Sequence, residues 1–162
     1  MSKYKPEEMM PVFRHFWQAR NEALELGFTD NGGAIHSAER IAEMMARHHV
    51  YGGRFGAGYK LAEDAHCSVA ARDARQAAIE AGTPRKDLLK TVEIEHVLPV
   101  RAMTREIGAL VDAGATDAEV LDWLSTNFRM VLLTPDERKA VDARNRSEIC
   151  PDRLAGIDLH SI

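Results

Sequence analysis

Two short strand-like runs, the first with alternating apolar and polar residues, constrain the fold of this chain most, because apolar residues elsewhere recur at helical spacing. Residues 88–100 have an apolar period of about two, and Pro99 closes the run. The alternating positions are Val92, Ile94 and His96 on one side of the run and Glu93, Glu95 and Val97 on the other. The second run covers residues 128–133. We therefore predict a mostly helical α+β protein with one small pair of strands.

Helical spacing predicts most of the remaining elements. The expected helices cover residues 7–26, a stretch ending near His49, an Ala-rich stretch at 60–81, and the stretches 101–113 and 117–126 between the strands. A final helix opens with Thr134-Pro135-Asp136-Glu137 and runs to about Ala143. Thr at the N-cap, Pro at the first position and Glu three residues after the cap form a capping box.

The length of 162 residues suits one domain of ordinary size with its own core. We expect a single domain over residues 1–162, with a helical N-terminal half. In this division residues 1–87 form a helical support. Residues 88–143 hold the strands and the last helix, with a helical insertion at 101–126. Residues 144–162 form a polar tail that is ordered by docking on the domain.

Composition is that of a soluble globular protein, with 45% hydrophobic and 28% charged residues. No run approaches the roughly 18 to 20 apolar residues that cross a bilayer, and no apolar signal core follows the first residues. The two cysteines, Cys67 and Cys150, are too few for a disulfide framework or a Cys-rich zinc site. We expect a cytoplasmic protein, without a membrane partner, whose cysteines are ordinary thiols.

The distribution of charge is more informative than the net charge of −4. That sum argues against a surface coated with basic groups for nonspecific nucleic-acid binding. Residues 91–126 hold two basic and seven acidic residues, so acid is concentrated around the strand-like run that begins at residue 88. A cation site would explain this clustering, and a solvated acidic helix face would explain most of it equally well.

Glu95 and His96, side by side in the first strand-like run, form the candidate reactive pair. A carboxylate can hold a divalent metal ion while a neutral imidazole removes a proton from water, and together they can split a phosphodiester. Asn127 stands at the start of the second run. The alternative for Glu95 and His96 is structural: an ion pair at the end of a strand, or a half-buried histidine with satisfied hydrogen bonds.

The segments EIEHVLPV and NFRMVLLTPDERK resemble the HNH nucleases, whose ββα-metal hairpin holds one divalent ion. The resemblance covers roughly residues 88–143. It implies that His96 is the general base, that Glu95 binds the metal ion, and that Asn127 fixes the imidazole ring through its second nitrogen. The helical first half of the chain is not explained by the resemblance.

The chain departs from the HNH pattern where the family usually has a final His or Asn as a metal ligand. The aligned position here falls at or near Arg138, and a guanidinium has no acceptor for a cation. Asp136 is the preferred replacement in an all-oxygen Mg²⁺ or Mn²⁺ site, because Glu137 is expected to serve the capping box. His160 is a further donor if the tail folds back. Arg138 is then expected to contact the scissile phosphate.

The expected function is therefore metal-dependent cleavage of double-stranded DNA by an HNH-type endonuclease, in restriction or phage defence. Cutting both strands would favour a homodimer, since a single-metal site cuts one strand. The alternative, given the missing ligand, is a non-catalytic DNA-binding or protein-interaction protein that retains a degenerate HNH fold.

A helix-turn-helix regulator is a third interpretation, because residues 103–127 have the pattern of an amphipathic helix, a turn with glycine and a second helix. Its second helix would have to enter the major groove of DNA. That helix carries Asp117, Glu119 and Asp122 and no basic residue, so it would meet the phosphates with like charge. We therefore interpret the segment as a helical insertion between the two strands.

Overall fold

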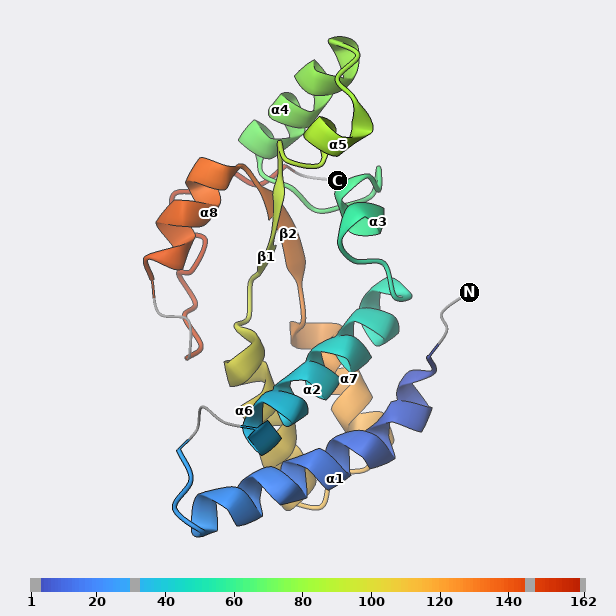
Figure 1. The fold of residues 1–162 in the computed structure, drawn as a ribbon, viewed down its shortest axis with the longest axis vertical. Helices are drawn as coiled ribbons and strands as arrows, with labels where there is room; N and C mark the ends of the chain where they lie inside the picture. The colour runs from blue at the N-terminus through green and yellow to red at the C-terminus, as the bar shows by residue number, and fades with distance from the viewer. Residues whose placement is uncertain (1–3, 30–32, 145–147, 161–162) are drawn as a thin grey trace. The chain divides into compact units, whose positions relative to one another are not determined.

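The computed structural model describes residues 4–29, 33–144 and 148–160. The long helices of this part of the chain are α1 (Pro6–Glu25), α2 (Gly33–Tyr51), α4 (Val69–Glu80), α6 (Val100–Asp112), α7 (Asp117–Asn127) and α8 (Pro135–Asp142) (Figure 1). Two four-residue helices, α3 (Ala57–Lys60) and α5 (Arg85–Leu88), and two strands, β1 (Glu93–His96) and β2 (Met130–Leu133), complete the fold. The predicted class, mostly helical α+β with one pair of strands, is confirmed.

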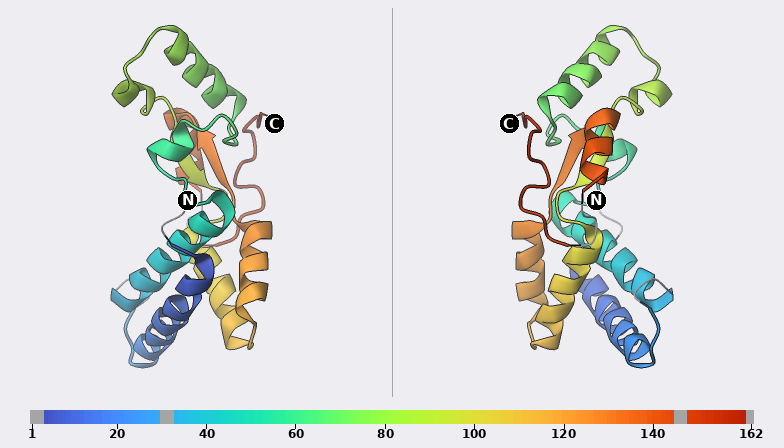
Figure 2. Two further views of the ribbon diagram at one scale, coloured as in Figure 1. Left: turned by 90° about the vertical axis from the view of Figure 1, so that its right-hand side faces the viewer. Right: turned by 90° about the vertical axis from the view of Figure 1, so that its left-hand side faces the viewer.

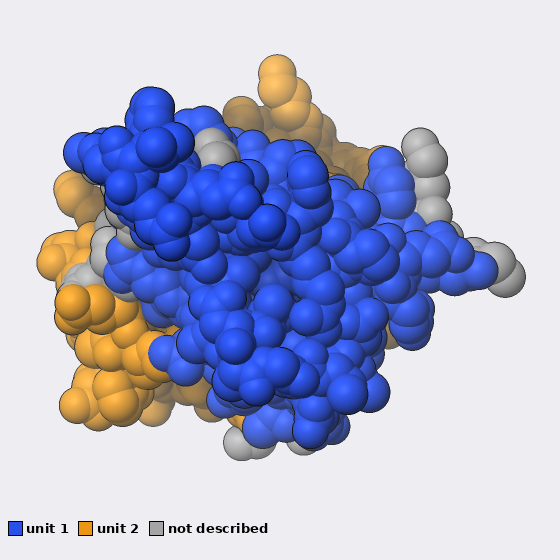
Figure 3. All heavy atoms as spheres, turned by 90° about the horizontal axis from the view of Figure 1, so that it is seen from below, with its two compact units in different colours: residues 1–54, 99–128 blue, residues 55–98, 129–162 orange. Residues whose placement is uncertain are grey.

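The chain forms two compact units that interleave in sequence: residues 1–54 with 99–128, and residues 55–98 with 129–162 (Figure 3). This division differs from the predicted one. The stretch between the strands joins α1 and α2 in unit 1, whereas residues 55–87 join the strands in unit 2. The reason is burial: the apolar faces of α6 and α7 pack against α1 and α2.

Unit 1 consists of two helical hairpins, α1 with α2 and α6 with α7 (Figure 2). Its core is made of apolar side chains that are at most 5% exposed, among them Phe13, Trp17, Met45, Ile107 and Leu124. Helices α1 and α6 are in close contact at Gly108, where an added Cβ would lie 2.2 Å from an indole carbon of Trp17. The Trp17 indole N–H also donates to Asp112 at 2.9 Å.

In unit 2, β1 and β2 pair antiparallel, with Glu95 opposite Val131 and His96 opposite Met130. Residues 66–68 lie along the other edge of β2, where the Leu132 N–H donates to the His66 carbonyl at 2.8 Å. The C-terminal segment continues this ladder, because the His160 N–H donates to the Cys67 carbonyl at 2.9 Å. Flanked on both edges, β2 is buried at all four positions.

Helix α8 begins with the predicted capping box, which the structure confirms. The Thr134 hydroxyl accepts from the Glu137 N–H, and the Glu137 carboxylate accepts from the Thr134 N–H at 2.9 Å. The same carboxylate also accepts a 2.6 Å hydrogen bond from the buried Ser68 hydroxyl, which caps α4. Glu137 therefore links the N-termini of two helices.

Three predicted elements have different bounds in the structure. The Ala-rich helix expected at 60–81 forms only at Val69–Glu80, because residues 66–68 pair with β2 and Ser68 caps the helix. The run at 88–100 is a strand only at Glu93–His96. Asn127, expected to open the second strand, instead ends α7, and β2 begins at Met130.

Candidate functional site

The candidate site is in unit 2, where β1 brings Glu93 and Glu95 to the same face of the sheet. Residues two apart on a strand share a face, so the two carboxylates lie side by side. Glu95 is only 3% exposed, whereas Glu93 is half-buried. A buried carboxylate needs charged or hydrogen-bonding partners, since its desolvation costs several kcal/mol.

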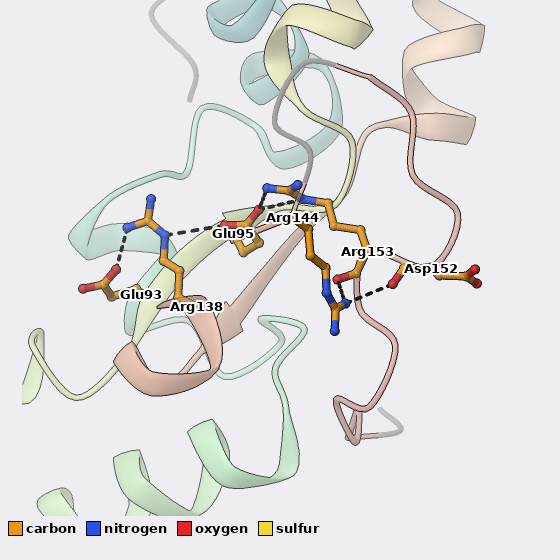
Figure 4. Close-up of polar contacts among 6 residues, drawn as sticks. All are labelled: Glu93, Glu95, Arg138, Arg144, Asp152 and Arg153. Atoms are coloured by element: carbon orange, nitrogen blue, oxygen red, sulfur yellow. Dashed lines mark hydrogen bonds and ion pairs between the residues drawn. The ribbon is translucent and has the colours of Figure 1, made fainter. Parts of the chain in front are cut away.

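Glu95 has partners of this kind in Arg153 and Arg138, and its carboxylate lies between their guanidiniums (Figure 4). Arg153, itself 4% exposed, donates to Oε1 of Glu95 from Nε at 2.9 Å and from Nη2 at 2.5 Å. The Nε of Arg138 lies 3.5 Å from Oε2. Each carboxylate oxygen of Glu95 therefore faces a different positive charge.

Arg138 also donates to Glu93, from Nη1 to Oε2 at 2.5 Å. This hydrogen bond is the main reason that the pKa of Arg138 is raised above its ordinary value, against the opposing effect of burial. Glu93, Glu95, Arg138 and Arg153 thus form one network, which we call the Glu–Arg cluster.

Arg144 holds the segment that carries Arg153. Its guanidinium donates to the backbone carbonyls of Asp152 at 3.0 Å and of Arg153 (Figure 4). It also donates to the Ala155 carbonyl at 2.8 Å. In the same segment, Leu154 and Ile157 pack on the buried residues Val131, Leu133 and Val141. Residues 148–160 thus contact the rest of unit 2 through both hydrogen bonds and apolar packing.

The other predicted site residues of unit 2 are placed differently. His96 is half-buried at the last position of β1, so it projects to the opposite face from Glu95. Asp136 is exposed in the first turn of α8, where a carboxylate favours the helix dipole. The Nδ1 of His160 lies 3.0 Å from a guanidinium nitrogen of Arg72, which is not a member of the Glu–Arg cluster.

Asn127 lies at the C-terminus of α7 and does not open the second strand. It is exposed at the end of α7, in unit 1, and its amide group donates to the Trp123 carbonyl one turn earlier at 2.8 Å. The side chain is thus used to satisfy a helix C-terminus, as amide side chains often are.

The Glu–Arg cluster does not fit the metal ion that the HNH resemblance implies. Among residues 4–29, 33–144 and 148–160, no three His, Cys, Asp or Glu side chains come together as a metal-binding group. An ion on Oε1 of Glu95 would have to displace both hydrogen bonds from Arg153, and an ion on Oε2 would lie beside the Arg138 guanidinium, which carries like charge. Arg138, predicted to contact a phosphate, instead contacts carboxylates.

Sequence reasoning missed Glu93 and Arg153 as members of the cluster. The signal for Glu93 was present, because the period of two places it on the same face as Glu95. Two neighbouring carboxylates on a face that is partly buried require cations. No local pattern identifies Arg153, which lies 58 residues from Glu95 in the sequence.

Unit 1 contains an open cavity of about 410 Å³ between α1, α2 and α7. Its lining residues are Glu7, His49, Asp117, Ala118, Leu121, Asp122 and Ser125. The Nε2 of His49 lies 2.8 Å from the Ser125 hydroxyl, and Asp117 pairs with Arg14 at 2.7 Å. The lining therefore combines two apolar residues, Ala118 and Leu121, with the carboxylates of Glu7, Asp117 and Asp122.

Comparison with protein-family models, with curated proteins and with solved structures finds no match to this chain. Within the described part of the chain, no helix has the length and apolar character to cross a membrane.

Proposed function

We propose that this chain is a non-catalytic protein-interaction module that retains the strand–strand–helix order of an HNH element. The observation that carries the proposal is the engagement of Glu95. Its buried carboxylate is bonded twice by Arg153 and lies 3.5 Å from the Nε of Arg138. The structural alternative for Glu95, a strand-end ion pair, accounts for this arrangement without a reaction.

Cleavage of DNA with Mg²⁺ or Mn²⁺ remains a prediction that this geometry supports less well. The three residues of the expected reaction have other surroundings: Glu95 is ion-paired, His96 is on the opposite strand face, and Asn127 bonds its own helix. A homodimer and a cytoplasmic location remain predictions as well.

Charge favours a protein partner over DNA. Glu119 and Asp122 are exposed on α7, and residues 106–128 contain no Lys or Arg. The phosphates of a duplex would meet this surface with like charge. A partner with Lys or Arg side chains would be attracted by these carboxylates, and the aliphatic stems of such side chains suit the apolar lining residues Ala118 and Leu121.

The catalytic part of the proposal is tested by incubating supercoiled plasmid with the purified protein and Mg²⁺ or Mn²⁺. The wild-type protein and His96→Ala, both verified as folded by circular dichroism, are expected to leave the plasmid intact. Nicking by the wild type that disappears in His96→Ala would refute the proposal and favour the nuclease.

The binding part is tested by fluorescence anisotropy with a short Lys/Arg-rich peptide, a matched acidic peptide and a duplex DNA. We expect the basic peptide to bind best and Asp122→Lys to weaken it. The matched control is Glu106→Lys, because Glu106 is an exposed carboxylate of α6 outside the cavity lining. Duplex DNA that binds more tightly than the basic peptide would contradict this choice of partner.

A further inference from the structure

The Glu–Arg cluster has the charge balance of a divalent metal site. Glu93 and Glu95 contribute two negative charges, and Arg138 and Arg153 contribute two positive charges. A divalent ion held by two carboxylates would have the same sum. The two guanidiniums, however, are covalently part of the chain and cannot dissociate from it.

Burial makes this balance important for folding. Glu95 and Arg153 are 3% and 4% exposed. Removal of either side chain would therefore leave the charge of the other one buried and unpaired. Arg138 and Glu93 are more exposed, and their mutual ion pair is correspondingly weaker. The Glu95–Arg153 pair is therefore the critical part of the cluster.

The cluster also connects three segments of unit 2. Both carboxylates are on β1, Arg138 is on α8, and Arg153 is in the C-terminal segment. A metal ion in a ββα element has a similar connecting role, since its ligands come from different elements. Arg144 adds to the connection, because it fixes the backbone on both sides of Arg153.

We propose that Arg138 and Arg153 take the place of a metal ion in this element: their guanidiniums neutralise Glu95, dock the C-terminal segment and make the folding of unit 2 independent of divalent cations. This inference goes beyond the proposed function. Its test measures the stability of the fold and the effect of divalent cations on that stability, so the result does not depend on which partner the protein binds.

The test is a double-mutant cycle with Glu95→Gln, Arg153→Met and the double variant, measured by urea unfolding of the full chain. Arg153→Met is expected to lower the folding equilibrium constant by at least about 100-fold, because a buried carboxylate loses its main partner. The double variant is expected to regain most of this loss, since neither buried charge is then left unpaired. Arg85→Met, at an exposed arginine of the same unit, is the control and should change the constant by no more than about twofold.

The same unfolding curves are recorded for the wild type with EDTA and with Mn²⁺, and no shift of the midpoint is expected. A lower midpoint in EDTA would overturn the proposal, and so would an Arg153→Met effect as small as that of Arg85→Met.

Should Arg153→Met fail to fold, two measurements still decide. Arg153→Lys, which keeps the charge but loses the paired hydrogen bonds, should lower the folding equilibrium constant by more than Arg85→Met does, and an effect no larger than that of Arg85→Met would overturn the proposal. Electron paramagnetic resonance of Mn²⁺ should show no uptake by the wild type, and uptake that Glu95→Gln abolishes would contradict the proposal.

Discussion

At the scale of single residues, burial decides which charged side chains act as structure. Glu95 is acidic, adjacent to a histidine and on a strand, yet it is almost fully enclosed and contacts two guanidiniums. Asp136 is an exposed carboxylate whose place in the first turn of α8 suits the helix dipole. The chemistry available to each carboxylate thus depends on its surroundings more than on its neighbours in sequence.

The two cysteines should differ in reactivity for the same reason. Cys67 is 4% exposed, and burial raises the pKa of its thiol above the ordinary value of 9.0, although Arg75 and Arg72 oppose the shift. Cys150 is half-buried. A thiol reagent in folded protein should therefore react with one cysteine quickly, and Cys150→Ser should remove that fast phase. A fast phase that persists in Cys150→Ser would contradict this account.

The raised pKa of Cys67 also gives stability a pH dependence. A group whose pKa is higher in the folded state contributes stability that is fully present below its ordinary pKa of 9.0. This contribution is lost as the pH rises through the raised value. Cys67→Ala should show a smaller loss of stability above pH 9.0 than the wild type when urea midpoints are compared, and equal losses would contradict the assignment.

At the scale of elements, local signals predicted what local interactions build. The capping box at Thr134 and the alternation at residues 93–96 each depend only on residues that are close in sequence. For that reason α8 and β1 could be predicted. Asn127 could not be placed, because it lies at a junction between helix and strand and the packing of α7 decides where the helix ends. The pairing of Arg153 with Glu95 depends on the docking of a segment 58 residues away, which no local pattern encodes.

A second capping box, at the start of α7, predicts a pH effect of opposite sign. Hydrogen bonds from the backbone N–H and hydroxyl of Thr116 lower the pKa of Glu119 below its ordinary value of 4.5. The stabilisation is therefore present above pH 4.5 and is lost as the pH falls through the lowered value. Urea midpoints on both sides of pH 4.5 should fall less in Glu119→Gln than in the wild type. An unchanged pH profile in this variant would contradict the role of the carboxylate.

The contact between α1 and α6 predicts that Gly108→Ala is destabilising. The added Cβ would lie 2.2 Å from the Trp17 ring, which is buried and hydrogen-bonded to Asp112. Such overpacking should cost about 1–3 kcal/mol in the free energy of unfolding. Gly58→Ala is the control, because no atom lies within 4 Å of its added Cβ, and it should be neutral or slightly stabilising. Equal stability of the two variants would show that the helices can separate at no cost.

At the scale of the whole molecule, the helices between the two strands belong to one compact unit and the strands to another. The sequence indicated the insertion and the small sheet, but it could not reveal that residues 55–87 join the strands, because that grouping depends on pairing between residues 66–68 and β2. The element that resembles an HNH hairpin is thus completed by segments from both sides of it in sequence. The carboxylates of Glu93 and Glu95 on its first strand are paired with Arg138 and Arg153.

The most direct test is a crystal structure of the wild-type protein soaked in Mn²⁺, with anomalous scattering recorded at a wavelength where manganese contributes strongly. We predict that Arg153 remains hydrogen-bonded to Glu95 and that no anomalous peak lies within coordination distance, about 2 Å, of the Glu95 oxygens. An anomalous peak bound to Glu95 with Arg153 displaced would contradict the account and restore a metal-dependent nuclease as the better explanation of this fold.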